Sequence, residues 1–202
     1  MDPDVERFER WSATYDRWPL QMLLFNVVHR RVARSLSPTA QERVLDVGCG
    51  SGRLAVRLVR SSGCRAVGVD PAPGMVAQAL RKAETARTGF CVGVAEALPF
   101  RAASFDAAVT AVSVHHWKDA DRGLEEMRRV LRRGGRVVVA DMGTPGRLVS
   151  WVKHLTRAER HHHGGWEARE LADLLYRAGF DRVRACTERA ARHRVVILQA
   201  LG

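Results

Sequence analysis

Short apolar runs alternate with amphipathic helical stretches along most of the chain. The runs are rich in Val and Ala and are bounded by charged residues, Gly or Pro, as is typical of buried β-strands. They occupy residues 44–47, 66–69, 89–94, 105–112, 136–141, 181–187 and 193–200. Between them, residues 53–58, 73–80, 119–131 and 166–178 repeat apolar side chains at the spacing of one helix face. This alternation predicts an α/β fold with a doubly wound, mostly parallel sheet of seven strands and helices on both faces.

The same pattern predicts the organisation of the chain. Residues 5–36 have helical spacing on both sides of Pro19, which predicts two helices that form an N-terminal helical cap. We find no internal repeat and expect a single domain. It comprises the cap over residues 1–40, a core over 41–142, and a partial lid with the last two strands over 143–202. Residues 132–135, Arg-Arg-Gly-Gly, predict a turn before the fifth strand, and residues 145–157 predict a helix within the lid.

The run at 44–47 leads into three glycines at alternate positions, Gly48, Gly50 and Gly52, followed by a helical stretch. Glycine lets a tight turn adopt unusual dihedral angles and lets a ligand approach the backbone, and the N–H groups of the new helix then face that ligand. Dinucleotide-binding turns are spaced G-x-G-x-x-G, one residue wider than this loop. Asp46 beside the loop would repel a pyrophosphate and suits a ligand with a cationic amino group.

Residues 44–52, VLDVGCGSG, resemble motif I of the class I S-adenosylmethionine-dependent methyltransferases. Later segments are also similar to that family in sequence and in order: the TYD before motif I, the AEALPF after the third strand, the LEEMRRVLRRGG before the fifth, and the ELADLLYRAGF of the last helix. The similarity covers roughly residues 15–180 and comes closest to members that methylate quinones, lipids and natural products. It implies a Rossmann-like fold, S-adenosylmethionine as cofactor and S-adenosylhomocysteine as product.

The resemblance also implies which residues bind the cofactor. Tyr15 would border its methionine end, the motif I loop would hold the amino acid part, and residues after the second and third strands would hold the adenosine. The expected cofactor-binding residues are Tyr15, Asp46, Gly48, Cys49, Gly50, Asp70, Pro71, Ala95, Glu96 and Ala111. For Tyr15, plain packing within the cap is an open alternative.

Asp70 is supported by its position as well. It follows Gly48 by about the separation at which nucleotide-binding folds place a ribose-binding acid, and a carboxylate accepts from both ribose hydroxyls. The alternative is that Asp70 caps the helix that follows. The adenine contact is less well defined, because Val94 stands where the family commonly has a polar residue. We therefore expect backbone groups near Ala95 and the Glu96 side chain to serve it.

His115 and His116 follow the fourth strand, where an open α/β sheet binds its ligand. Three interpretations are open for them: a general base, a hydrogen-bond donor to the acceptor, or capping and packing residues. Both are our candidate catalytic residues. Residues 161–163 are three adjacent histidines, which cannot all ligate one metal from a regular element, so we expect no metal site there.

Composition and charge change this picture little. The formal charge of +11 over 202 residues permits attraction to anions, but most of it is arginine spread along helices, which favours a solvated basic surface. Peripheral contact with an anionic membrane stays open, whereas we do not expect nucleic acid as the partner. The four cysteines form no C-x-x-C pair, which indicates free thiols and a cytoplasmic location. We expect a monomer or a homodimer.

The predicted activity is methyl transfer from S-adenosylmethionine to a small, partly apolar acceptor. Transfer from a sulfonium is an in-line displacement with an activated leaving group, so positioning and exclusion of water are the main requirements, and a base is optional. Two alternatives remain: a methyltransferase of RNA or protein, suggested by the charge, and a nucleotide-binding protein without activity. The glycine spacing and Asp46 argue against a nicotinamide oxidoreductase.

Overall fold

The computed structural model describes residues 3–17, 19–83, 85–143, 166–190 and 193–202. The predicted turn at residues 132–135 and the two last strands fall in these ranges. The helix predicted at 145–157 and the histidines at 161–163 lie outside the described residues.

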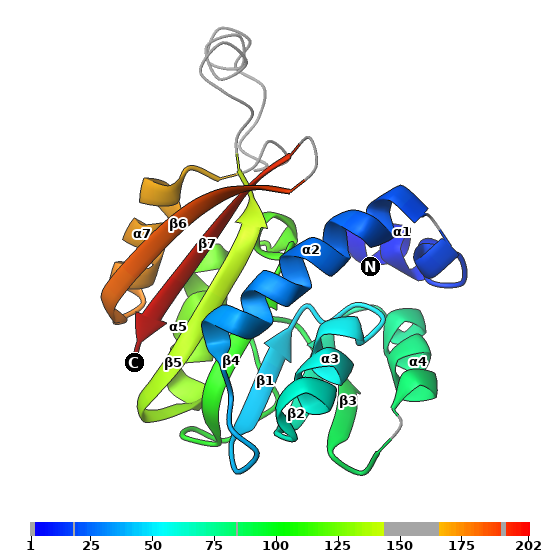
Figure 1. Ribbon diagram of the computed structural model, residues 1–202, viewed down its shortest axis with the longest axis horizontal. Coiled ribbons are helices and arrows are strands. Elements are labelled where there is room, and N and C mark those ends of the chain that lie inside the picture. The colour runs from blue at the N-terminus through cyan, green and yellow to red at the C-terminus, as the bar shows by residue number, and fades with distance from the viewer. Residues whose placement is uncertain (1–2, 18, 84, 144–165, 191–192) are drawn as a thin grey trace, which may run out of the picture.

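Seven strands form one sheet, as predicted (Figure 1). They are β1 Arg43–Val47, β2 Arg65–Asp70, β3 Thr88–Val92, β4 Phe105–Ala111, β5 Leu131–Met142, β6 Asp181–Ala190 and β7 His193–Leu201. Their order is β3-β2-β1-β4-β5-β7-β6, with β7 antiparallel to β5 and β6 and the neighbouring pairs β1–β2, β1–β4, β2–β3 and β4–β5 parallel. The direction in which successive strands are added reverses between β1 and β4, where open α/β sheets bind their ligands.

Helices cover both faces of the sheet because successive strand residues point to opposite sides. Val44 packs with α2 (Pro19–Leu36) and α3 (Arg53–Ser62) on one face, whereas the neighbouring Leu45 packs with α5 (Ala120–Val130) and α7 (Ala168–Arg177) on the other. The remaining helical elements are α1 Pro3–Trp11, η1 Tyr15–Arg17, α4 Pro73–Lys82 and η2 Val114–His116. Among the described residues, no helix has the length and apolar character needed to cross a membrane.

Two predicted boundaries were wrong. Residues 132–135 form a bulge inside β5 rather than a turn before it: Phe105 pairs with Leu131, and Ala107 already pairs with Arg136. The bulge is held because the Gly134 N–H donates to the carbonyl of Gly202 and the Gly202 N–H donates to that of Gly135. The third strand ends at Val92, two residues earlier than predicted.

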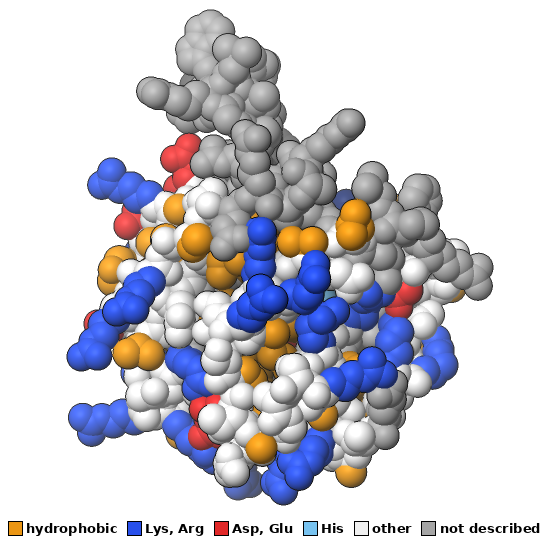
Figure 2. All heavy atoms as spheres, viewed as in Figure 1, with side chains coloured by type: hydrophobic (Ala, Val, Ile, Leu, Met, Phe, Trp, Pro, Cys, Tyr) orange, Lys and Arg blue, Asp and Glu red, His pale blue; other side chains and the backbone are white. Residues whose placement is uncertain are grey.

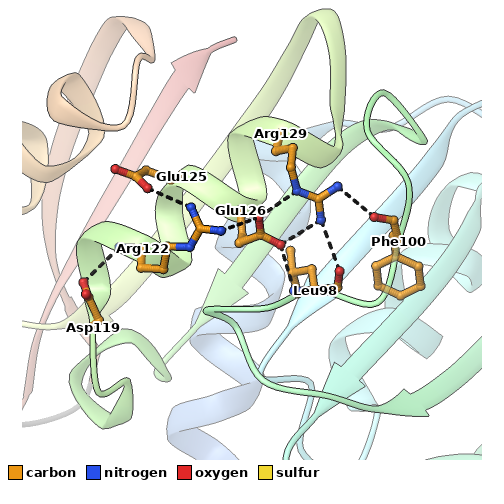
Figure 3. Close-up of polar contacts among 7 residues, drawn as sticks. All are labelled: Leu98, Phe100, Asp119, Arg122, Glu125, Glu126 and Arg129. Atoms are coloured by element: carbon orange, nitrogen blue, oxygen red, sulfur yellow. Dashed lines mark hydrogen bonds and ion pairs between the residues drawn. The ribbon is translucent and has the colours of Figure 1, made fainter.

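A polar cluster on α5 holds the loop that follows β3 (Figure 3). Glu126 is buried and accepts the Leu98 N–H at 2.9 Å and a two-pronged donation from the Arg129 guanidinium, at 2.7 Å to each oxygen. Arg129 also donates to the carbonyls of Leu98 and Phe100, at 3.1 and 2.9 Å. A buried carboxylate is stabilised when it is paired and fully hydrogen-bonded. Arg129 is exposed to solvent at the surface of α5 and still pairs with this buried carboxylate, which its position in the sequence did not predict.

Replacing Arg129 by Ala should lower the free energy of unfolding by about 1–2 kcal/mol, because two hydrogen bonds to carbonyls and the partner of buried Glu126 are lost while the half-exposed guanidinium is partly screened. Urea denaturation measures the difference against Arg133→Ala, an exposed arginine in the β5 bulge. The pKa of Glu126 is lowered, chiefly by the hydrogen bond from Arg129. The contribution is therefore present above pH 4.5, the ordinary pKa of Glu, and is lost as Glu126 takes up a proton below it. Equal midpoints for the two variants would contradict this account.

Candidate functional site

A cavity of about 280 Å³ lies at the carboxyl ends of the parallel strands, next to β1 and β4, between which the strand order reverses. Its walls come from three parts of the chain: the loops after β1, β2, β3 and β4, the helices α1 and η1 of the cap, and the start of α4. The predicted site residues that line it are Tyr15, Gly48, Gly50, Asp70, Pro71, Ala95, Glu96 and His116. Four other predicted residues, Asp46, Cys49, Ala111 and His115, are not part of its wall.

The glycine loop forms the floor next to β1. Gly48, Gly50 and Gly52 have φ angles of +70°, +52° and +78°, a region that residues with a side chain rarely adopt. A Cβ on Gly48 would lie 1.9 Å from the Ser113 Oγ, whereas a Cβ on Gly50 would meet no atom within 4 Å and would enter open space. The loop therefore brings bare backbone to the cavity at Gly50, as the sequence predicted.

Asp70 fixes this loop to the neighbouring strand. Its Oδ2 accepts the Gly50 N–H at 2.8 Å and its Oδ1 accepts the Ala72 N–H at 3.0 Å. The N-cap position of α4 is Ala72, so Asp70 is not the capping residue itself. Burial raises the pKa of Asp70, and the two backbone hydrogen bonds oppose that shift. Asp70 also lines the cavity.

Asp46 is almost completely buried beneath the loop, and its Oδ2 has no hydrogen-bond partner among the described residues. Burial raises its pKa to about 7; the Ala55 N–H opposes this shift, and the charge of Asp70 adds to it. An unpaired buried carboxylate is costly, so a cationic group brought near it would be favourable. Asp46 does not line the cavity, so its unpartnered oxygen favours a cationic group through the electrostatic field behind the glycine loop, the property for which the sequence singled out Asp46.

The wall beyond β3 is mostly apolar. Val94 is 44% exposed where it faces the cavity, and Ala95 is buried next to it. The Glu96 Oε1 accepts the N–H groups of Lys118 and Asp119 at 2.9 and 3.3 Å, so its side chain is engaged in holding the start of α5. This arrangement can receive a flat aromatic base between apolar surfaces and backbone groups.

Cys49 and Ala111 support the site from behind. Cys49 is buried against Gly68, where an added Cβ would lie 2.7 Å from the Cys49 Sγ, and burial raises the pKa of its thiol well above the ordinary value. Such a thiol is unreactive, so size explains the residue. Ala111 ends β4 and packs against the core on the side of α2 and α3.

The two histidines point to different partners. His115 Nδ1 lies 2.6 Å from the Oδ1 of the fully buried Asp141, and its backbone N–H donates to the other oxygen of that carboxylate at 3.1 Å. His116 Nδ1 lies 3.0 Å from the Oδ2 of Asp4 on α1, and its ring packs edge-on against Phe8. The pKa of His116 is lowered to about 4, chiefly by burial and next by the charge of His115.

Residues 45–139 match the sequence model of a family described as "Methyltransferase domain". The chain is 35% identical over 141 residues to a demethylmenaquinone methyltransferase from Clavibacter sepedonicus, covering 68% of this chain and 57% of that protein. It is 38% identical over 140 residues to the aklanonic acid methyltransferase DauC from Streptomyces sp. (strain C5), covering 66% and 62%. The chain carries a class I S-adenosylmethionine-dependent methyltransferase domain.

The fold of this methyltransferase domain has solved counterparts. A SAM dependent methyltransferase from Aquifex aeolicus superposes with a TM-score of 0.74 at 18% identity, over 99% of each chain. The seven-stranded, mostly parallel sheet predicted from the sequence is therefore confirmed. The matches to the two curated relatives span 57% and 62% of their lengths.

Sequence reasoning missed several residues of the methyltransferase cavity. Asp4, Val5 and Phe8 of α1, Met75 of α4, and Ser113 with Trp117 after β4 all line it. The sequence did predict that the N-terminal helices and the loop at residues 115–117 bound the acceptor pocket, and Phe8 and Trp117 do line the cavity. It did not predict which side chains of α1 do so, because spacing cannot tell a helix face that packs from one that borders a cavity. Among the described residues, no group of three or more His, Cys, Asp or Glu is arranged to hold a metal ion.

Replacing Gly50 by Val should abolish S-adenosylhomocysteine binding, a loss of at least about tenfold in affinity, because the side chain enters the cavity. Gly134→Val is a matched control: Gly134 also has positive φ, and open space around its Cβ position, but it lies in the β5 bulge. Both variants should lose roughly 1–2 kcal/mol of stability from backbone strain. Calorimetry then separates them, and normal binding by Gly50→Val would contradict the cofactor placement.

A second prediction follows from Asp46. Asp46 has a pKa of about 7 in the folded protein without ligand and 3.8 when unfolded, so the folded chain keeps the proton to a higher pH. The free energy of unfolding therefore falls as pH rises from about 4 to about 7. A bound ammonium group would stabilise the charged carboxylate, so affinity for S-adenosylhomocysteine should rise with pH and level off above about 7. Asp46→Asn should remove both slopes and weaken binding. Calorimetry and thermal unfolding across this range measure them, and an Asp46→Asn variant that keeps both slopes would assign them to another group.

Proposed function

We propose that the chain transfers a methyl group from S-adenosylmethionine to a small, partly apolar acceptor, mainly by positioning the two. The observation that carries this proposal is that one cavity is lined both by the glycine loop with Asp70 and by the aromatic side chains Phe8 and Trp117. The glycine loop and Asp70 suit the cofactor, and the aromatic side chains suit an apolar acceptor. The names of two relatives, which act on demethylmenaquinone and aklanonic acid, support a small-molecule acceptor.

The cofactor would lie along the loops after β1, β2 and β3. Asp46 and the glycine loop would hold its amino acid part, Asp70 its ribose, and the Val94–Ala95 segment its adenine. S-adenosylmethionine supplies a methyl group on a sulfonium, which needs no further activation of the leaving group. What the chain has to supply is orientation and a dry environment.

The cap provides much of that environment. Val5, Phe8 and Tyr15 line the cavity from α1 and η1, and the ring centroids of Phe8 lie 6.4 Å from those of Tyr15 and 5.0 Å from those of His116. In the loop after β4, the Trp117 Nε1 donates to the Ser113 Oγ at 3.0 Å, which fixes the indole. Rigid aromatic side chains of this kind bind flat, partly apolar molecules and exclude water.

The histidines support positioning over base catalysis. His116, with a pKa of about 4, is neutral at physiological pH but a weak base, and its Nδ1 is already held by Asp4. His115 is held by Asp141 and is not part of the cavity wall. Both contacts order the loop after β4, beside the place where the acceptor would sit.

Reducing conditions in the cytoplasm remain our proposal for where the enzyme works. Cys49, Cys64 and Cys91 are free thiols in the structure, which is compatible with that compartment. The oligomeric state stays a prediction of monomer or homodimer.

Calorimetry with S-adenosylmethionine, S-adenosylhomocysteine and NADH is the first test. We expect the two sulfur compounds to bind with micromolar dissociation constants and NADH not to bind. Methyl transfer from isotopically labelled S-adenosylmethionine to a panel of quinones and phenolic natural products then tests the acceptor class. Binding without turnover on any acceptor of the panel, together with methylation of RNA or protein from a cell extract, would contradict the proposal.

Single-turnover rates at saturating cofactor test the roles of the histidines. We expect His116→Ala and His115→Gln each to slow transfer by less than about 100-fold, since neither histidine acts as a base. The pH dependence of the rate should then be set by the pKa of the acceptor in both variants. Unchanged affinity for S-adenosylhomocysteine would show that each variant keeps its fold. A loss beyond about 100-fold that is rescued at high pH would overturn the positioning mechanism.

A further inference from the structure

A second, larger cavity of about 570 Å³ lies between α2, α3 and α4 and shares no lining residue with the first. Its wall contains Arg53, Arg57 and Arg60 of α3 and Arg81 and Lys82 of α4. Among the described residues that line it there is no aspartate or glutamate. Figure 2 shows Lys and Arg side chains gathered over the α2 and α3 face of the molecule. We call this cavity the basic cleft.

Two guanidinium groups of the basic cleft are held side by side. Arg53 and Arg57 are one helical turn apart on α3, and their Nη2 atoms donate to the same oxygen, the Asn26 Oδ1, at 3.1 and 3.2 Å. Asn26 and His29 lie on α2, in the opposite wall. Guanidinium forks fixed in this way match the oxygen geometry of a phosphate group, which arginine binds through paired hydrogen bonds.

The charges of the cleft repel one another. The pKa of Arg57 is lowered, first by burial and then by the charges of Arg30, Arg53 and Arg60. The pKa of His29 is lowered to about 3, first by burial and then by Arg53 and Arg57, so its ring is neutral. Asp16 partly neutralises the positive charge near Lys82, with which it pairs, and near Arg53, from which it lies 3.7 Å. An anion bound in the cleft would reduce the repulsion among the cations around Arg57.

We propose that the basic cleft binds a phosphate-bearing ligand, either as a free pyrophosphate or phosphate ester or as the headgroup of an anionic lipid. Its volume is within the range of ligand-binding pockets. Its cations come from two helices and converge on one space, unlike charges spread along a surface. The site is separate from the methyl-transfer cavity and does not depend on the proposed activity.

The basic cleft is also in contact with the glycine loop. Lys82 donates to the carbonyl of Ser51 at 2.9 Å, and the Ser51 Oγ donates to the Asp16 Oδ1 at 3.0 Å. Ser51 lies between Gly50 and Gly52. A phosphate that draws Lys82 away from Asp16 therefore acts on a contact that supports the glycine loop.

Calorimetric titration of the full chain with inorganic pyrophosphate tests the site directly. We expect binding to wild type and at least about tenfold weaker binding to the double variant Arg57→Gln/Arg81→Gln, which removes one cation from each of two helices. The matched control is Arg101→Gln/Arg133→Gln, which loses the same charge at exposed positions outside both cavities and should stay within about twofold. Unchanged circular dichroism spectra and thermal midpoints confirm the fold of each variant.

Vesicles identify the source of the phosphate. Binding to phosphatidylcholine vesicles only when they contain phosphatidylglycerol, with displacement by pyrophosphate, assigns the cleft to a lipid headgroup; pyrophosphate binding without vesicle binding assigns it to a free ligand. Equal weakening in the two double variants would overturn the proposal, because net charge alone would then explain the binding. Tight binding of a short RNA duplex by a chain that does not bind pyrophosphate would also overturn it.

Discussion

The turn from β1 into α3 imposes the strictest requirement on the site. Gly48, Gly50 and Gly52 all have positive φ. A Cβ at Gly48 would overlap Ser113, and a Cβ at Gly52 would overlap Ala79 and Phe90. At Gly50 the backbone faces the open space of the cavity. Only glycine meets these conditions without strain or overlap. Asp70 then holds the turn in place from the neighbouring strand, through the Gly50 N–H. The cavity, the start of α3 and the position of α4 all depend on this one arrangement.

Two buried carboxylates beside this turn affect both the stability of the fold and the ligand that the cavity can accept. Asp46 and Asp70 are both buried near the loop, and each has a raised pKa because burial disfavours its charged form. Two backbone N–H groups donate to Asp70 and compensate for its burial, whereas an oxygen of Asp46 has no partner among the described residues. A fold selected for stability alone would not retain such a group. The unfavourable free energy of burying this carboxylate is explained if a cationic ligand bound near it stabilises its charge.

The sequence predicted what depends on local pattern. The apolar runs and the glycine spacing were enough for the sheet and the loop, because strand burial and positive φ are encoded by neighbouring residues. It did not predict the bulge at residues 132–135, which depends on pairing with Gly202 at the other end of the chain. Nor did it predict the contact of His116 with Asp4, separated by 112 positions, or the role of Arg129, since a helical arginine has the same local pattern whether it faces solvent or a buried carboxylate.

The anchoring of α1 bears on how long a ligand stays bound. None of its residues is fully buried. Polar contacts hold it at Asp4, which pairs with His116, at Glu9, which accepts the Gly74 N–H at 2.7 Å, and just after its end at Ser12, whose carbonyl accepts from Gln78. An element with so little buried apolar surface opens locally at a small fraction of the free energy of global unfolding. Since α1 contributes to the wall of the cavity, local opening of this helix would widen the exit for a bound ligand without unfolding the sheet.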